Sequence, residues 1–277
     1  MNKLLLYTHK LVHRIRAKAI NLFAYESNND IFNTILIIGS ARSGTTFLME
    51  SINSDNKYRV IFEPFNEDDV KEWSGYVSRH YIDPQFPTQK EKRDIYNILS
   101  GNVSNKWVNR YNYKRHSDKR LIKAVRANLL IPYIRATYPD LKIIYITRNV
   151  EEVVASRMKL KFGNELTSIL THKNFLDKYY PNIDAQILKD IQDPIAYHTA
   201  LWHLENQILI KRLVEYRLDH IDYNNIIGKE ISYGKDGKLK IVKTTKGTKK
   251  SQATSHKNTY HLSQSELKQI DIISRMF

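Results

Sequence analysis

Residues 39–46 combine glycines and hydroxyl side chains in a spacing that can bind a phosphate. An apolar run at residues 35–38 leads into Gly39-Ser40-Ala41-Arg42-Ser43-Gly44, and a helical pattern begins at Thr45. The backbone N–H groups of such a loop and the N-terminus of the following helix converge on an anion. Loops that bind ATP or GTP continue from the second glycine with lysine. Here Thr45 follows Gly44 and the cation is Arg42, which disfavours an NTPase; a tight turn without a ligand stays open.

A second cation stands at the end of another predicted strand. The apolar run at residues 142–147 ends at Arg148, and Ser156 follows eight residues later in a predicted helix. An arginine and a hydroxyl in this arrangement can bind a phosphate through charge-assisted hydrogen bonds. A solvated strand-end charge is the alternative for Arg148. Together with the loop upstream, the pair predicts a ligand with two phosphate-like groups.

The elements that would position these residues alternate between strand and helix. The sequence predicts strands at residues 35–38, 58–62, 121–125, 141–147 and 220–223, and helices at residues 129–138, 150–161, 194–217 and 263–276. The strands are apolar on both faces, which is typical of a buried parallel sheet. The predicted fold is a single α/β domain with a P-loop-type central parallel β-sheet flanked by helices.

Two segments fall outside this alternation. Residues 68–119 are polar and rich in aromatic and charged side chains, which predicts a long insertion of loops and short helices that shapes a substrate cleft. Residues 231–233 and 238–242 flank Gly-Lys-Asp-Gly, which predicts a hairpin. Residues 243–257 then carry five lysines and no acidic residue, which predicts a flexible basic loop.

Composition narrows the classes of function. Among 277 residues, 44 Lys and Arg against 29 Asp and Glu give a net charge of +15, which indicates an anionic partner. The absence of cysteine excludes disulfides and thiolate chemistry and fits a cytoplasmic protein. No stretch approaches the roughly 18 apolar residues of a membrane span. Residues 1–23 form a basic amphipathic pattern within an N-terminal segment, residues 1–29, that docks on its own domain or contacts a membrane peripherally.

Longer segments resemble a known family. GSARSGTTF at residues 39–47 and KIIYITRNVEEVVASR at residues 142–157 resemble the two phosphate-binding segments of sulfotransferases that use 3'-phosphoadenosine 5'-phosphosulfate (PAPS). The resemblance continues in the same order through FEPF at residues 62–65, LIKAVR at 121–126, HIDYNNI at 220–226 and NTYHLSQSEL at 258–267. The branch that the chain most resembles is that of the carbohydrate sulfotransferases.

The resemblance implies roles for individual residues. The 5'-phosphosulfate would be held by Arg42, Ser43, Gly44, Thr45 and Thr46, and the 3'-phosphate by Arg148 and Ser156. Phe47 would stack on the adenine, with a core position as the alternative. Lys246 lies in a basic segment that resembles the one closing over PAPS in the family. Residues 30–277 would form the sulfotransferase domain.

Sulfuryl transfer resembles phosphoryl transfer, because negative charge grows on the bridging oxygen as the nucleotide leaves. We expect Arg42 and Lys123 to stabilise that charge; for Lys123, a strand-end charge is the alternative. Glu63 resembles the glutamate that serves as base in polysaccharide-type enzymes and is the predicted general base, with a structural ion pair to an arginine such as Arg126 as the alternative. The chemistry requires no metal, and no histidine pair has convincing metal-ligand spacing.

The resulting hypothesis is transfer to a hydroxyl or amine of a carbohydrate, and an acidic glycan would account for the excess charge. A small-molecule or nucleotide kinase stays open, although the missing loop lysine opposes it. A nucleic-acid-binding module is permitted by the charge, but no known motif supports it, so no nucleic-acid partner is expected. Asn149-Val150 replace the usual aspartate and proline of the family, and Tyr260 replaces a frequent tryptophan.

Overall fold

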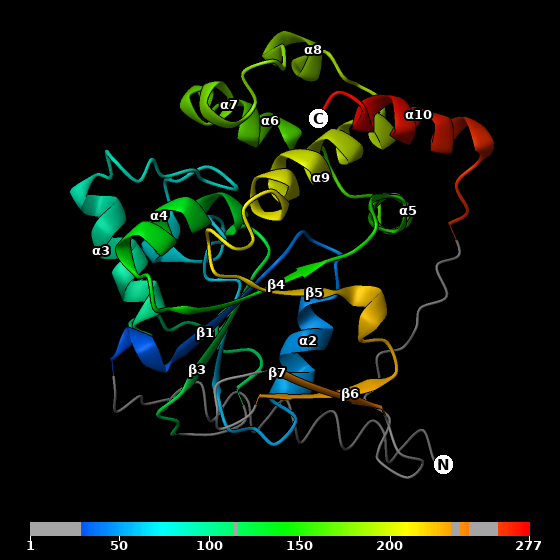
Figure 1. The fold of residues 1–277 in the computed structure, drawn as a ribbon. Helices are drawn as coiled ribbons and strands as arrows, with labels where there is room; N and C mark the ends of the chain where they lie inside the picture. Colours follow the sequence, from blue (N-terminus) through cyan, green and yellow to red (C-terminus); the bar gives the residue numbers. More distant parts are fainter. Residues whose placement is uncertain (1–28, 113–115, 234–238, 244–259) are drawn as a thin grey trace.

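The structure is a computed structural model that describes residues 29–112, 116–233, 239–243 and 260–277. A five-stranded sheet lies at its centre, with the order β2-β3-β1-β4-β5 and parallel pairing throughout (Figure 1). The strands are Thr34–Ile38 (β1), Arg59–Phe62 (β2), Arg120–Ala124 (β3), Lys142–Thr147 (β4) and Asp219–Asp222 (β5). The predicted α/β fold with a central parallel sheet is confirmed.

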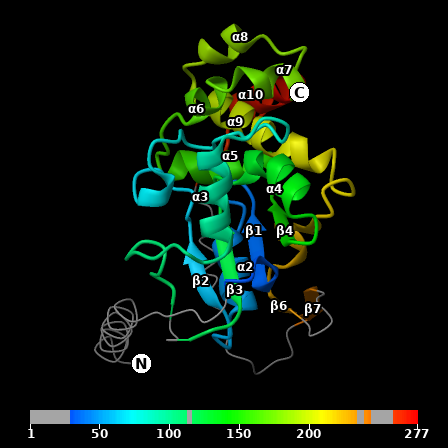
Figure 2. The ribbon, with the colours of Figure 1, turned by 90° about the vertical axis from the view of Figure 1, so that its left-hand side faces the viewer.

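Helices cover both faces of this sheet. The α-helices are Thr45–Ile52 (α2), Gln89–Leu99 (α3), Ile131–Thr137 (α4), Val150–Lys159 (α5), Leu166–Leu170 (α6), Lys173–Tyr179 (α7), Ala185–Lys189 (α8), Pro194–Ile210 (α9) and Gln264–Ser274 (α10). Short 3₁₀ helices lie at Ile31–Asn33, Lys71–Trp73, Asn128–Leu130 and Tyr223–Asn225. In Figure 2, α6, α7, α8 and α10 gather around α9 at one end of the molecule.

The period of two along each strand separates two cores. Leu36 and Ile38 of β1 join the larger core, which includes side chains of α3, α4 and α9. Ile35 and Ile37 face the opposite side and pack with Leu48 of α2. Because both faces of a parallel sheet are covered, its strands are continuously apolar rather than alternating.

An antiparallel pair, Lys229–Tyr233 (β6) and Leu239–Lys243 (β7), confirms the predicted hairpin. Ile231 of β6 belongs to the core that contains α2, so the hairpin covers the same face as that helix. In the described part of the predicted insertion, the 3₁₀ helix Lys71–Trp73 is followed by α3, whose start is stabilised by a capping box between Thr88 and Glu91.

The long helix α9 ends at Ile210, not at Arg217 as predicted. The chain then passes through turns to Arg217, which has a left-handed φ of 46°. The Arg135 guanidinium donates to the carbonyl oxygens of Tyr216 at 2.6 Å and Arg217 at 3.2 Å. A buried side chain therefore holds this turn, and the helical pattern does not reveal such a long-range partner.

The replacement of the usual Asp-Pro by Asn149-Val150 leaves the start of α5 intact. The Asn149 side chain accepts from the N–H groups of Glu151 at 2.8 Å and Glu152 at 3.4 Å. Asparagine is as good an N-cap as aspartate. The helix that follows Arg148 is therefore well started despite the substitution.

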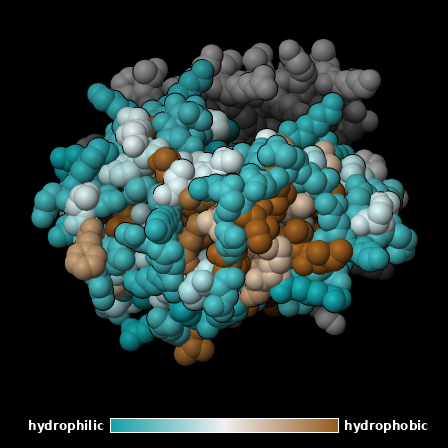
Figure 3. Space-filling view, turned by 90° about the horizontal axis from the view of Figure 1, so that it is seen from above, coloured by the Kyte–Doolittle hydropathy of each residue, from teal (hydrophilic) through white to brown (hydrophobic). Residues whose placement is uncertain are grey.

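The face seen from above in Figure 3 is largely hydrophilic, with some apolar residues between the polar ones. Exposed apolar side chains on the elements near this end include Ile187 of α8 and Ile272 of α10, each 54% exposed. Within the described ranges, no helix combines the length and apolar character needed to cross a membrane. Two predicted segments lie outside the described residues. These are the N-terminal helix of residues 1–23 and residues 244–257 of the basic loop, which include Lys246.

Candidate active site

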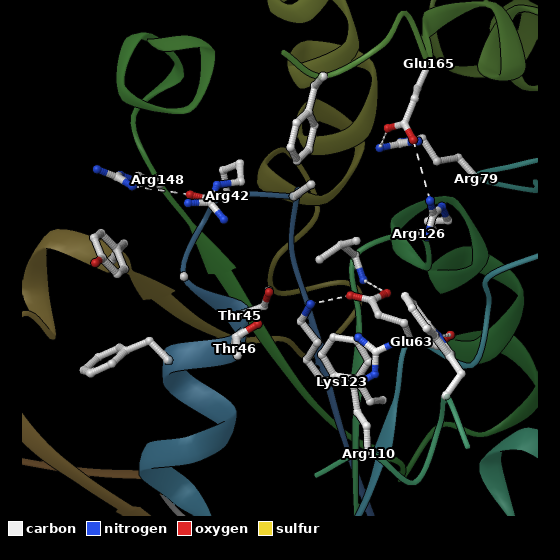
Figure 4. Close-up of a pocket in the computed structure, with 18 residues that line it drawn as sticks. Arg42, Thr45, Thr46, Glu63, Arg79, Arg110, Lys123, Arg126, Arg148 and Glu165 are labelled. Atoms are coloured by element: carbon white, nitrogen blue, oxygen red, sulfur yellow. Dashed lines mark hydrogen bonds and ion pairs between the residues drawn. The ribbon is translucent and has the colours of Figure 1, made fainter. Parts of the chain in front are cut away.

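A cavity of about 410 Å³ opens beside the phosphate loop and the ends of β2 and β3 (Figure 4). This volume is in the range of small-ligand sites, and ligands of open α/β sheets bind at the carboxyl ends of the strands. The cavity is lined by Ala41, Arg42, Gly44, Thr45, Thr46, Phe47, Phe62, Glu63, Arg79, Trp107, Arg110, Lys123, Val125, Arg126, Arg148, Phe162, Glu165 and Tyr223.

The loop between β1 and α2 packs closely against its neighbours, and it can do so only because two of its residues are glycines without a Cβ. A Cβ on Gly39 would lie 2.4 Å from the carbonyl oxygen of Ile146. A Cβ on Gly44 would lie 2.3 Å from the Tyr223 ring, and Gly44 has a φ of 92°. Arg42 also adopts a left-handed φ, 78°, a conformation that few residues other than glycine adopt. The loop is therefore held in one shape from both sides.

Two arginines gather at the loop end of the cavity. Arg42 Nε donates to the Ser156 hydroxyl at 3.0 Å, and Arg148 Nη1 donates to the Arg42 carbonyl at 3.4 Å. Arg148 also pairs with Glu152 at 3.1 Å and lies 4.7 Å from the centre of the Tyr223 ring. Partial burial, together with the charge of Arg148, lowers the pKa of Arg42. Adjacent cations of this kind favour an anionic ligand.

Glu63 and Lys123 form a buried ion pair in the middle of the cavity. Phe62 and Lys123 are register partners in β2 and β3, which brings the next residue, Glu63, beside the lysine. Lys123 Nζ donates to Glu63 Oε1, and the Val125 N–H donates to Oε2 at 3.0 Å. Glu63 is 4% exposed and has a left-handed φ of 45°. Its partner is Lys123, so the alternative pair with Arg126 is not formed.

An aromatic wall flanks this ion pair. Trp107 Nε1 donates to the Glu63 carbonyl at 3.3 Å, and the Trp107 and Phe62 rings meet edge to face at 5.8 Å. The Arg110 guanidinium lies 3.5 Å from the centre of the Trp107 ring, a cation–π geometry. The prediction from sequence missed Trp107 and Arg110, because nothing in the irregular insertion indicates which side chains turn inward.

The end of the cavity away from Arg148 carries both positive and negative side chains (Figure 4). Arg79 Nη2 donates to Glu165 Oε2 at 2.7 Å, and Arg126 Nη2 lies 3.6 Å from Glu165 Oε1. Burial alone would lower the pKa of Arg79, but Glu205 and Glu165 raise it above its ordinary value. Burial alone would raise the pKa of Glu165, but Arg79 and then Arg126 lower it. These charges therefore persist at neutral pH.

The structure brings most of the predicted site residues into one cavity. The predicted residues that line the cavity are Arg42, Gly44, Thr45, Thr46, Phe47, Glu63, Lys123 and Arg148. The Ser43 and Ser156 side chains are buried and lie outside the lining. The Ser43 hydroxyl is buried without a hydrogen-bond partner, and Ser156 reaches the site through Arg42. Tyr223 was missed as a site residue, although it lies within the HIDYNNI segment.

Comparison with protein-family models gives one match, described as Sulfotransferase family, over residues 34–226. No curated protein and no solved structure matches the chain. The matched range runs from the first residue of β1 to just beyond β5, so it spans the parallel sheet and the cavity. Among the residues that the structure describes, no cluster of three metal-ligating carboxylate or histidine side chains is present.

Proposed function

The chain belongs to the sulfotransferase family, and we propose that it transfers a sulfuryl group from PAPS to a hydroxyl or amine of a carbohydrate acceptor. The observation that carries this proposal is one cavity with a phosphate loop and Arg148 at one end and the Glu63–Lys123 pair at its centre. A donor with two phosphate-like groups fits the first end, and an acceptor that must lose a proton fits the second.

The residues present fit the donor nucleotide. The loop of residues 39–46 leads into the N-terminus of α2, where helix N–H groups can bind an anion, and Thr45 and Thr46 line the cavity for the 5'-phosphosulfate. Arg148 and Ser156 would hold the 3'-phosphate, and Phe47 would face the adenine.

The reaction requires a base and cations, and the centre of the cavity supplies both. The acceptor oxygen forms a bond to sulfur while the bond from sulfur to the 5'-phosphate oxygen breaks, and the acceptor proton passes to Glu63. Lys123 and Arg42 stabilise the negative charge that grows on the leaving oxygen. The Val125 N–H and the Lys123 ammonium fix both oxygens of Glu63, so its carboxylate is oriented before the acceptor arrives.

The acceptor in this proposal is a sugar, with an acidic glycan as the favoured form. Aromatic rings such as Trp107 offer an apolar face to a sugar ring, and Arg110 lies beside it. Arg126 Nε donates to the Ser78 hydroxyl at 3.1 Å, and the guanidinium lies 3.6 and 3.8 Å from its two carboxylate neighbours, so neither carboxylate is within hydrogen-bonding distance of it. The net charge of +15 would also attract an acidic chain. A preference for neutral aromatic alcohols would overturn this choice.

The first experiment is a thermal-shift measurement with 3'-phosphoadenosine 5'-phosphate (PAP), the product nucleotide, compared with ATP and AMP. A ligand that binds only the folded state raises the melting temperature. We expect a selective shift with PAP that is lost in Arg148→Ala. A larger shift with ATP would replace the proposal with a kinase. A cytoplasmic location is proposed on the sequence alone, with residues 1–23 either docked on their own domain or in peripheral contact with a membrane.

A further inference from the structure

Glu205 of α9 is completely buried, and its carboxylate accepts hydrogen bonds from three side chains. The Ser40 hydroxyl donates to Oε2 at 2.5 Å, and Arg157 Nη2 donates to the same oxygen at 3.2 Å. Arg79 Nε donates to Oε1. Glu205 is 0% exposed, and the two arginines are 2% and 1% exposed. No water-accessible surface is therefore left on the carboxylate, and it cannot touch a substrate.

Two of these partners reach the phosphate loop. Ser40 is a loop residue, and its hydroxyl also accepts from Asn206 Nδ2 at 2.7 Å. Arg157 Nη2 also donates a hydrogen bond to the Ala41 carbonyl oxygen at 3.4 Å. Arg157 follows Ser156, the residue that holds Arg42. Helix α9 thus holds Ser40 directly, and it holds the next residue, Ala41, through Arg157 of α5.

The third partner reaches the opposite end of the cavity. Arg79 uses Nε for Glu205 and Nη2 for Glu165 at 2.7 Å, and Glu165 lines the cavity beside Arg126. Arg79 adopts a left-handed φ of 56°, which the surrounding contacts must over-determine. One buried carboxylate therefore connects both ends of the cavity through side chains that are themselves buried.

Stability alone is a weak reason for this arrangement. Taking two arginines and a glutamate out of water is costly, and apolar replacements of buried ion pairs are often neutral or stabilising. We propose that Glu205 is a positioning residue: it holds the phosphate loop through Ser40 and Arg157, and it holds Glu165 through Arg79. This role rests on the proposed function, because the loop is positioned for the PAPS phosphates.

Ser40→Ala isolates the first connection. Ser40 is 0% exposed, so its side chain cannot contact a nucleotide, and the substitution removes one oxygen atom without adding bulk. We expect at least tenfold weaker binding of PAP by isothermal titration calorimetry, measured well below the melting temperature. The acceptor KM at saturating PAPS should stay within twofold of wild type, because the Arg79 connection is intact.

Glu205→Gln tests both connections together. The amide keeps the size of the side chain but loses the charge and one acceptor that the arginines use. We expect weaker PAP binding and also a higher acceptor KM than in Ser40→Ala. If this variant does not fold, Ser40→Ala alone decides the question.

Asp94→Asn is the matched control. Asp94 of α3 is a buried carboxylate, 5% exposed, that accepts from Tyr76, Lys90 and Arg93 at 3.0, 2.8 and 3.2 Å. Like Glu205 it binds one hydroxyl and two cations, but none of its three partners lines the cavity. We expect lower stability with unchanged PAP affinity. A wild-type chain that fails to bind PAP would overturn the proposed function. Wild-type binding together with unchanged affinity in folded Ser40→Ala would overturn only the role of Glu205.

Discussion

The loop end of the cavity and the end around Glu165 differ in how their charges are balanced. At the loop end, Arg42 bonds the neutral hydroxyl of Ser156, and Arg148 pairs with Glu152, whose side chain is 41% exposed. At the other end, Arg79 is held by two carboxylates, Glu165 and Glu205, and is 2% exposed. The first end leaves positive charge facing the cavity, whereas the second has most of its charge neutralised internally.

This difference in charge balance indicates which kind of ligand each end of the cavity can bind. Cations without a full complement of carboxylates attract an anionic ligand, which supplies the missing charge on binding. A buried network whose charges already pair with one another gains little from a new charge and serves instead to fix the shape of the wall. We therefore expect the loop end to provide affinity for the donor. Under the proposed function, we expect the far end to select the acceptor mainly through geometry and through the loosely paired Arg126.

The largest effect is expected where the two ends meet. Glu63→Gln removes the proposed base but keeps the size of the side chain, so kcat should fall by about 10²- to 10⁴-fold, while PAP affinity stays within twofold. Steady-state kinetics and calorimetry measure the two quantities. Glu50→Gln, on the exposed side of α2 and outside the cavity lining, is the control. Normal turnover in Glu63→Gln would show that this residue takes no part in the reaction. The comparison would then no longer include a catalytic group between the two ends of the cavity.

The next effect tests whether the loop end depends on a single backbone shape. Gly44→Ala places a Cβ 2.3 Å from the Tyr223 ring at a φ of 92°. The left-handed backbone alone costs about 1–2 kcal/mol for a residue with a Cβ, and the ring must also move. We expect PAP affinity to fall by more than about 30-fold, since 1.4 kcal/mol is a factor of ten.

Two other glycines separate strain from collision. Gly75 has a φ of 87° with nothing within 4 Å of a new Cβ, and Gly163 has open space as well, with no positive φ. Gly75→Ala should lower the melting temperature but not PAP affinity, and Gly163→Ala should change neither. Wild-type PAP binding by Gly44→Ala would mean that the loop adapts freely.

Arg126→Gln should act on the acceptor and not on the donor. The guanidinium is 3.6 Å from Glu165 and 3.8 Å from Glu67, so these pairs are longer than hydrogen bonds and worth little. A charged hydrogen bond to an acidic acceptor is worth about 1.5–3 kcal/mol, so the KM for such an acceptor should rise about tenfold or more. PAP affinity and the KM for a neutral sugar should not change. Equal losses for acidic and neutral acceptors would assign Arg126 a purely structural role.

The loop end was largely predictable from the sequence because its residues are contiguous. Residues 39–47 contain the loop, its cation and the start of α2, and the segment ending at Arg148 forms the neighbouring strand β4. Local chemistry settles such features: glycine at a crowded turn and apolar residues in a buried strand. The capping box of Ser263 and Glu266, which begins α10, was predictable for the same reason.

The far end was not predictable because its residues meet only in three dimensions. Arg79 lies in the irregular insertion, Glu165 lies just before α6, and Glu205 lies in the middle of α9. Nothing in the helical pattern of α9 distinguishes a buried glutamate with two arginine partners from a solvated one. The same limit applies to the end of α9, where Arg135 of α4 holds the turn through Tyr216 and Arg217.

The smallest effect concerns the aromatic face that supports the loop end. Arg148 lies 4.7 Å from the Tyr223 ring centre, and Phe47 meets that ring edge to face at 6.3 Å. A cation–π contact of this kind is worth about 0.5–1 kcal/mol at exposed sites, so Tyr223→Leu should weaken PAP binding about two- to fivefold. Tyr223→Phe keeps the ring and should bind PAP like wild type. An equal loss of PAP affinity in both variants would mean that the Tyr223 hydroxyl, rather than the ring, contacts the donor. Binding at the loop end would then depend on a neutral polar group as well as on the charges compared above.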